Sequence, residues 1–119
     1  MRNDAPRWTT SELRDLATLH SLQLTAGGSD DSVELGMVVV DGQLYVRSFR
    51  GVASRWYRAA IGSGDGRVIC GGWTRGVTFA AADDEVAGIE SAYASKYGGS
   101  AGLVGTAQAR AATLQISPR

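Results

Sequence analysis

The sequence predicts an α+β fold in which an antiparallel sheet of about five to six strands curls into a small barrel with three or four short helices. The chain has 119 residues, which is enough for a single domain spanning 1–119. Its 16 glycines outnumber its 2 prolines and separate strand-like runs, as is typical of a turn-rich β protein. Asp41-Gly42 lies between two apolar runs and is the strongest short signal for a β-hairpin.

The first predicted element is a helix near the start of the chain. Residues 1–7 are polar and are expected to be flexible. Thr9 and Glu12 form a capping-box signature, in which the glutamate reaches back to the cap. A helix of about ten residues should follow, with an apolar face at i, i+3, i+4 and i+7 spacing. That face consists of Leu13, Leu16, Ala17 and His20.

A β-ribbon over residues 33–49 is predicted around the Asp-Gly turn. If these two residues form a type I′ turn, Val38 lies opposite Tyr45. Side chains alternate between the two faces of a strand, so one face of the ribbon is apolar and is the expected core face. Its members are Met37, Val39, Leu44 and Val46. The other face ends in Tyr45 and Arg47 and is predicted to be a surface with a functional role.

The second half of the chain continues the same pattern. A short helix is predicted over 54–60, followed by a glycine-rich connection at 62–66 and a second ribbon over 67–80. Asp83 or Asp84 is expected to cap a further helix, and Gly98-Gly99 to end it. The spacing places Val86, Ile89, Tyr93 and Tyr97 on one side of this helix. A final strand over 111–116 is expected to stop at Pro118.

Composition excludes several classes of function. Lysine plus arginine and aspartate plus glutamate each number 12, so the net charge is 0 and no bulk attraction to nucleic acid or anionic membrane is expected. No run approaches the roughly 20 apolar residues needed to span a bilayer. The single cysteine, Cys70, excludes an internal disulfide and fits a cytoplasmic location. His20 and Cys70 are far apart in sequence and cannot form a conventional zinc site, so no metal site is predicted.

The glycine run at 62–66 and the acids at 83–85 have simple structural interpretations. The glycine run departs from the dinucleotide pattern because Arg67 occupies the last glycine position, and a hairpin-type connection explains it better. Helix capping explains the three acids better than a metal or an acid/base pair does. Cys70 lies in an apolar run, where buried structural cysteines are usual.

Four arginines near the middle of the chain form the sharpest candidate site. Arg47, Arg50, Arg55 and Arg58 are interleaved with Ser48, Gly51 and Ser54. They are either a solvated charged edge or an anion site, in which guanidinium groups and backbone amides at a helix start bind phosphate. Tyr93 and Tyr97 are either packing residues or tyrosines at a cavity mouth that donate a proton.

The run from Leu44 to Tyr57 resembles the centre of a small uncharacterised bacterial domain family, and most of the chain shares in this resemblance. A more distant similarity is to the deazaflavin-dependent nitroreductase group. It is carried by the same strand, by Ser48 and the small-residue loop, and by the Trp56-Tyr57 pair. That group has split β-barrels related to the flavin-binding pyridoxamine-phosphate-oxidase fold.

This second resemblance implies a split β-barrel oxidoreductase that binds FMN or a deazaflavin coenzyme, reduces a small organic substrate and forms a homodimer. It places Arg47, Ser48, Arg50, Gly51, Ser54, Arg55 and Trp56 at the phosphate and ring, and Tyr93 or Tyr97 beside the reactive ring. The group's proline before the aromatic pair and its long N-terminal extension are missing here. Two alternatives therefore stay open: a cofactor-free enzyme of cyclase or isomerase type, and a non-catalytic module that binds a small ligand.

Overall fold

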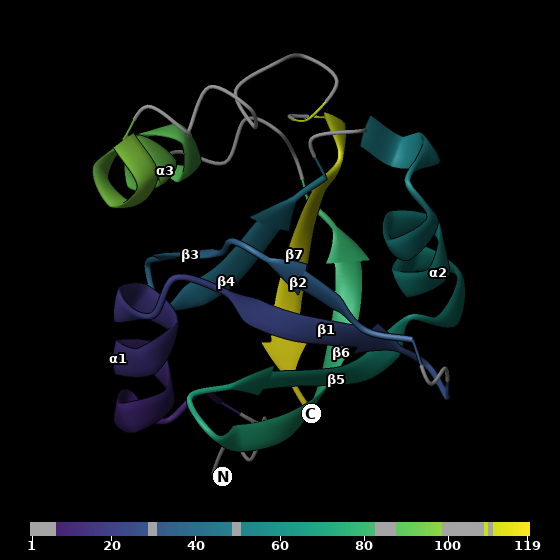
Figure 1. The fold of residues 1–119 in the computed structure, drawn as a ribbon, viewed down its shortest axis with the longest axis horizontal. Coiled ribbons are helices and arrows are strands. Elements are labelled where there is room, and N and C mark those ends of the chain that lie inside the picture. Colours follow the sequence, from purple (N-terminus) through teal and green to yellow (C-terminus); the bar gives the residue numbers. More distant parts are fainter. Residues whose placement is uncertain (1–6, 29–30, 49–50, 83–87, 99–108, 110) are drawn as a thin grey trace, which may run out of the picture.

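The computed structural model describes residues 7–28, 31–48, 51–82, 88–98, 109 and 111–119. In this part of the chain, all strands belong to one antiparallel sheet with the order β2-β1-β5-β6-β7-β4-β3 (Figure 1). The strands are β1 (Leu22–Ala26), β2 (Val33–Leu35), β3 (Val38–Val40), β4 (Gln43–Arg47), β5 (Asp65–Cys70), β6 (Trp73–Ala81) and β7 (Thr113–Pro118). Residues 1–7 were predicted to be flexible, and all of them except Arg7 lie outside the described residues.

The sheet curls because its two edge strands are neighbours in sequence. β2 and β3 lie at opposite ends of the strand order, yet only Gly36 and Met37 separate them. The sheet therefore bends back on itself into a half-barrel, which confirms the predicted α+β split-barrel fold. Its helical elements in the described residues are α1 (Thr10–Thr18), the 3₁₀ turn η1 (Gly51–Ala53), α2 (Arg55–Ser63) and α3 (Ile89–Tyr97).

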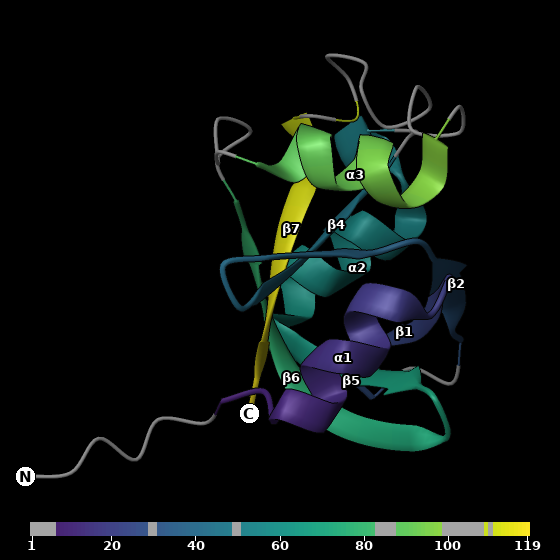
Figure 2. The same ribbon diagram turned by 90° about the vertical axis from the view of Figure 1, so that its left-hand side faces the viewer.

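The helices cover different parts of the sheet. Both α1 and α3 contact the edge strand β3, whereas α2 packs against β1, β5 and β6. Figure 2 shows the β3 segment crossing between α3 and α1. The main core lies inside the half-barrel and includes Leu16, Leu44, Val68 and Leu114. In the described residues, no helix is long and apolar enough to cross a membrane.

Helix α1 confirms the predicted capping box but ends earlier than expected. The Thr9 backbone nitrogen donates to Glu12 Oε1 at 2.8 Å, and the Glu12 nitrogen donates to Thr9 Oγ1 at 3.0 Å. Leu16 is fully buried. The helix stops at Thr18 because the chain becomes extended at Leu19 and enters β1. The prediction that His20 lies on its apolar face is therefore wrong, and His20 is exposed.

The Asp-Gly hairpin has the predicted register, with Val38 paired to Tyr45. Asp41 and Gly42 have φ values of 53° and 76°, as a type I′ turn requires. The ribbon is shorter than predicted, because β2 pairs with β1 and only β3 pairs with β4. This break and the unpredicted strand β1 raise the strand count in the described residues from the expected five or six to seven.

One face of this hairpin is core as predicted, but the other face is not a free surface. The expected core residues Met37, Leu44 and Val46 are fully buried. Val38 and Tyr45, on the opposite face, are also buried, because Ile89 and Tyr93 of α3 pack over them in a second small core. The prediction that this face is a surface with a functional role is therefore wrong for Val38 and Tyr45, which α3 covers. Whether the protein forms a homodimer stays a prediction.

The segment from 54 to 81 agrees with prediction except at its glycine-rich connection. Helix α2 continues to Ser63 and ends at Gly64, which adopts the left-handed conformation with φ of 76°. Residues 62–66 are thus the end of a helix and the start of β5 and not a hairpin-type connection. The β5–β6 hairpin turns at Gly71 and Gly72, which both have positive φ.

The last two elements are close to the predicted positions. Helix α3 begins at Ile89 with Gly88 at its N-cap position, so neither Asp83 nor Asp84 caps it as predicted. Those acids, Glu85, Val86 and Gly99 lie outside the described residues. Gly98 is the C-cap, in agreement with the prediction. β7 confirms the final strand, although it starts at Thr113 and includes Pro118, which pairs with Val77 at the end of the sheet.

Candidate ligand-binding pocket

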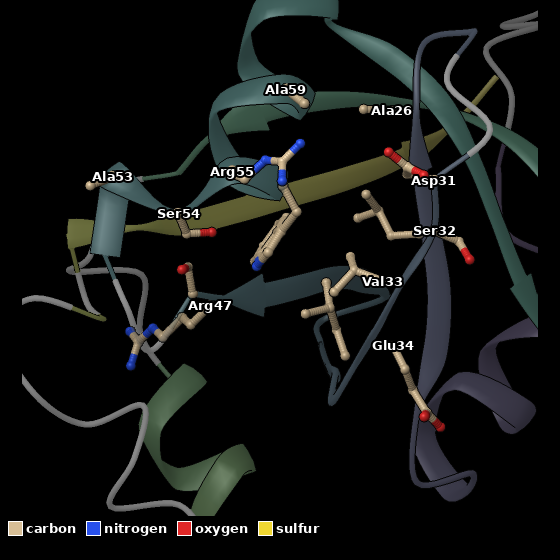
Figure 3. Close-up of a pocket in the computed structure, with 14 residues that line it drawn as sticks. Ala26, Asp31, Ser32, Val33, Glu34, Arg47, Ala53, Ser54, Arg55 and Ala59 are labelled. Atoms are coloured by element: carbon tan, nitrogen blue, oxygen red, sulfur yellow. The ribbon is translucent and has the colours of Figure 1, made fainter.

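A pocket of about 980 Å³ lies between strands β1 and β2 on one side and the segment from the end of β4 to the start of α2 on the other. One wall is formed by β1 and β2, and the other by the end of β4, η1 and the start of α2 (Figure 3). Its volume is at the upper end of the range of about 300–1,000 Å³ that is typical of small-molecule sites. Of the predicted site residues, the pocket brings together Arg47, Ser48, Ser54, Arg55 and Trp56.

Arg47 forms part of the wall, but its charge is directed elsewhere. Its Nε donates to Thr113 Oγ1 at 2.9 Å, and its Nη1 lies 3.8 Å from Glu90 Oε1. Figure 3 shows the guanidinium group pointing away from the pocket, toward α3. Arg47 is thus a buried link between β4, β7 and α3.

Ser48 follows Arg47 and also lines the pocket. Ser48 is only 2% exposed, and its hydroxyl has no hydrogen-bond partner among the described residues. Its backbone is fixed, since its nitrogen donates to Ala112 O at 3.2 Å and its carbonyl accepts from Gly51 N at 2.9 Å. A buried hydroxyl without a partner costs free energy, so the Ser48 hydroxyl would gain from a hydrogen bond to a water molecule or to a ligand group in the pocket.

The start of helix α2 supplies positive electrostatic potential beside Ser48. Ser54 is the N-cap, with its hydroxyl 3.5 Å from the Tyr57 nitrogen. Arg55 begins the helix and is exposed, and both residues line the pocket. A helix N-terminus with free backbone amides and an adjacent guanidinium favours an anion. Trp56 adds a half-buried indole, which packs edge-on against Tyr57.

The opposite wall was not predicted from the sequence. It contains the apolar side chains Leu24, Val33 and Leu35, together with the exposed carboxylates of Asp31 and Glu34. Figure 3 shows Asp31 and Glu34 across the pocket from Ser54 and Arg55, with the Glu34 side chain directed away from those residues. The alternation of leucine with polar residues over 22–25 is a strand signal that could have located this wall.

The remaining members of the predicted phosphate set do not line the pocket. Gly51 is buried, has a φ of 81° and supports the loop through its hydrogen bond to Ser48. Arg58 is exposed on α2 and is not among the lining residues. Arg50 lies outside the described residues, so its predicted role stays a prediction.

The two predicted catalytic tyrosines lie on α3 and do not line this pocket. Tyr93 is buried in the second core, and burial raises the pKa of its hydroxyl. The Tyr97 hydroxyl accepts a hydrogen bond from Met37 N at 2.8 Å and lies 2.9 Å from the carbonyl oxygen of His20. Burial also raises the pKa of Tyr97. Both side chains are thus committed to packing α3 on the sheet.

The described residues define a split-barrel protein with a pocket of about 980 Å³. Residues 12–116 match the family described as an uncharacterized protein conserved in bacteria (DUF2255), and the chain belongs to that family. This confirms the predicted resemblance to an uncharacterised bacterial family.

Comparison with solved structures supports the fold. The chain is similar to the crystal structure of a NimC/NimA family protein from Clostridium acetobutylicum, with a TM-score of 0.53 and 11% sequence identity. The match covers 89% of this chain and 77% of that protein. No curated protein matches the chain. At this identity the likeness shows a shared split-barrel fold and carries no activity with it.

Proposed function

We propose that the pocket binds a flavin-type cofactor, FMN or a deazaflavin coenzyme, and that the protein is an oxidoreductase acting on a small organic substrate. The observation that carries this proposal is the hydroxyl of Ser48, which is buried, unpaired within the described residues and located in the wall of a large pocket. It lies in the wall that also contains the start of α2.

The residues at the start of α2 suit the phosphate of such a cofactor. Ser48 and Ser54 offer hydroxyl donors, and Arg55 offers a guanidinium group that can pair with phosphate oxygens. The backbone amides of the first turn of α2 add further donors. Together these groups provide the donor chemistry that a phosphate monoester requires.

The remaining lining suits an aromatic ring. Leu24, Val33 and Leu35 form an apolar surface, and the Trp56 indole lies on the other wall. A planar ring placed between such surfaces buries apolar area and makes favourable aromatic contacts. A bound flavin would supply hydride chemistry, while the protein binds it, orients it and limits its contact with water.

The tyrosines have no part in this proposal. Tyr93 and Tyr97 do not line the pocket, so their positions do not support a role as proton donors there. The cofactor-free enzyme that the sequence left open would use tyrosine and arginine side chains, and the absence of both tyrosines from the pocket lining removes part of that chemistry.

Binding can be tested by titrating the purified protein with FMN and with a deazaflavin coenzyme and following cofactor fluorescence. We expect Arg55→Ala to weaken binding by about tenfold, the loss of one charge-assisted hydrogen bond. Arg58→Ala, on the same helix but outside the pocket, should bind as the wild type does. Failure of both cofactors to bind would reject the proposal.

Ser48→Ala provides a second test of the same site. Since its hydroxyl has no partner within the described residues, its removal should leave the melting temperature of the ligand-free protein unchanged or raise it. The same change should weaken cofactor binding. A large loss of stability without a change in binding would show that Ser48 has a structural role.

A further inference from the structure

A second pocket, of about 420 Å³, lies over β5 and β6 and shares no lining residue with the pocket described above. Glycines line much of it, and its charged lining residues are Asp65, Arg67 and Arg119. We propose that this pocket binds a phosphate group between the guanidinium groups of Arg67 and Arg119. This second site goes beyond the proposed function and uses none of the residues assigned to the flavin.

The two arginines flank a glycine across three neighbouring segments of the sheet. Arg67 of β5 is paired directly with Gly76 of β6. On its other side, the Gly76 carbonyl oxygen accepts a hydrogen bond from the Arg119 nitrogen at 2.9 Å, which continues the pairing of β6 with β7. Neighbouring strands are about 4.8 Å apart, so the two arginines lie in one row with a residue between them that has no side chain.

The Arg119 guanidinium lies over this glycine in a fixed direction. Its Nη1 donates to Asp65 Oδ2 at 2.7 Å. Its Nε and Nη2 lie 3.7 Å from the position that a Cβ of Gly76 would occupy. Asp65 therefore orients the group with one hydrogen bond and leaves the N–H donors at Nε and Nη2 for a ligand in the pocket.

The charged groups of this pocket leave an excess of positive charge. Among the described lining residues, two guanidinium groups are accompanied by one carboxylate, and that carboxylate is paired with Arg119. The Arg67 side chain is half-buried and has no hydrogen-bond or ion-pair partner in the described part of the chain. Like charges on neighbouring positions of a sheet repel, so an anion between the two arginines would be stabilised.

The number of donors favours phosphate over a carboxylate. Thr74 of β6 also lines the pocket and adds a hydroxyl to the two guanidinium groups. A guanidinium group can bind two oxygens of a phosphate at once, and a phosphate has enough oxygens for two such groups and a hydroxyl. The two oxygens of a carboxylate are matched by one guanidinium group alone. We therefore expect phosphate to bind at least about tenfold more tightly than acetate.

The test is a titration of ¹⁵N-labelled protein with inorganic phosphate at constant ionic strength, followed by NMR. The side-chain Nε–H signals of Arg67 and Arg119, assigned with single Arg→Gln variants, should shift and saturate. Arg67→Gln should weaken binding by about tenfold, measured on the Arg119 signal. Arg14→Gln removes an exposed arginine of α1 outside the pocket and should bind as the wild type does. Arg55→Ala should also leave these shifts unchanged, which separates this site from phosphate bound at the start of α2.

Gly76→Val tests the space beneath the Arg119 guanidinium. A valine side chain would occupy that space and displace the guanidinium, so phosphate binding should weaken by about tenfold or more. The melting temperature should be retained, because a β-branched residue suits a strand. Shifts that do not saturate, equal shifts with acetate, or unchanged binding in Arg67→Gln would overturn the inference. Each of these results leaves flavin binding at the other pocket unaffected.

Discussion

The hydroxyl of Tyr97 lies 2.8 Å from the backbone nitrogen of Met37 and accepts its hydrogen bond. Met37 belongs to the short junction at which β2 ends and β3 begins. Next to Tyr97, Lys96 donates to Met37 O at 2.7 Å and to Leu16 O at 2.9 Å. The end of α3 therefore holds together α1 and the junction between the two edge strands of the sheet.

Removing the Tyr97 hydroxyl should destabilise this junction. In Tyr97→Phe the amide of Met37 loses its partner, and we expect a loss of about 1–3 kcal/mol in the free energy of unfolding. Tyr57→Phe is a control on another helix, because burial, without a hydrogen bond, raises the pKa of the Tyr57 hydroxyl, and removal of that hydroxyl should cost less than about 0.5 kcal/mol. Urea denaturation measures both. Equal losses in the two variants would contradict this account.

Lys96 should make stability rise with pH in the alkaline range. Partial burial lowers the pKa of Lys96 from 10.5 to about 8, and the nearby Cys70 opposes this shift only in part. Between these two values the unfolded chain binds a proton that the folded protein has released, so stability increases as pH rises through this window. Below pH 8 the charged form is present in both states and the gain is absent.

Comparison with Lys96→Met isolates this effect, because the tyrosines and Cys70 titrate in both proteins. The stability of the wild type relative to the variant should increase between pH 8 and pH 10.5. A relative stability that stays constant or decreases over this range would show that Lys96 has an ordinary pKa. Direct titration of the Lys96 side chain by NMR provides an independent value.

Two glycines four residues apart should respond in opposite ways to alanine. A Cβ at Gly66 would overlap the backbone carbonyl oxygen of Thr25 and contact the Phe79 ring, because β1 and β5 approach closely there. We expect Gly66→Ala to cost at least about 1–3 kcal/mol. Gly62 lies in α2 with open space around the position of its Cβ, so Gly62→Ala should stabilise by about 0.5–1 kcal/mol. Thermal unfolding of both variants would reveal a failure of either expectation.

Local chemistry explains which parts of the fold could be predicted. The capping box at Thr9 and the turn at Asp41-Gly42 depend on neighbouring residues, and both agree with the structure. The break between β2 and β3 depends instead on Tyr97, which is 60 residues away from Met37. No local pattern in the ribbon indicates that contact, so the sequence suggested one continuous strand.

The same distinction applies to the candidate site. Ser48, Ser54, Arg55 and Trp56 are close in sequence, and their side of the pocket was predicted as a group. The direction of the Arg47 guanidinium was not predicted, because its partner Thr113 is 66 residues away. The opposite wall, from Asp31 to Leu35, forms only when β2 pairs with β1, and that pairing was not predicted.

The most direct test of the central claim uses the three tryptophans as reporters. Trp56 lines the pocket, whereas Trp8 and Trp73 pack together near Arg75 in another part of the molecule. The indole N–H signals of ¹⁵N-labelled protein, assigned with single Trp→Phe variants, would be followed during titration with FMN. We predict that the Trp56 signal shifts and saturates while the other two stay unchanged. An unchanged Trp56 signal at saturating FMN would contradict the account.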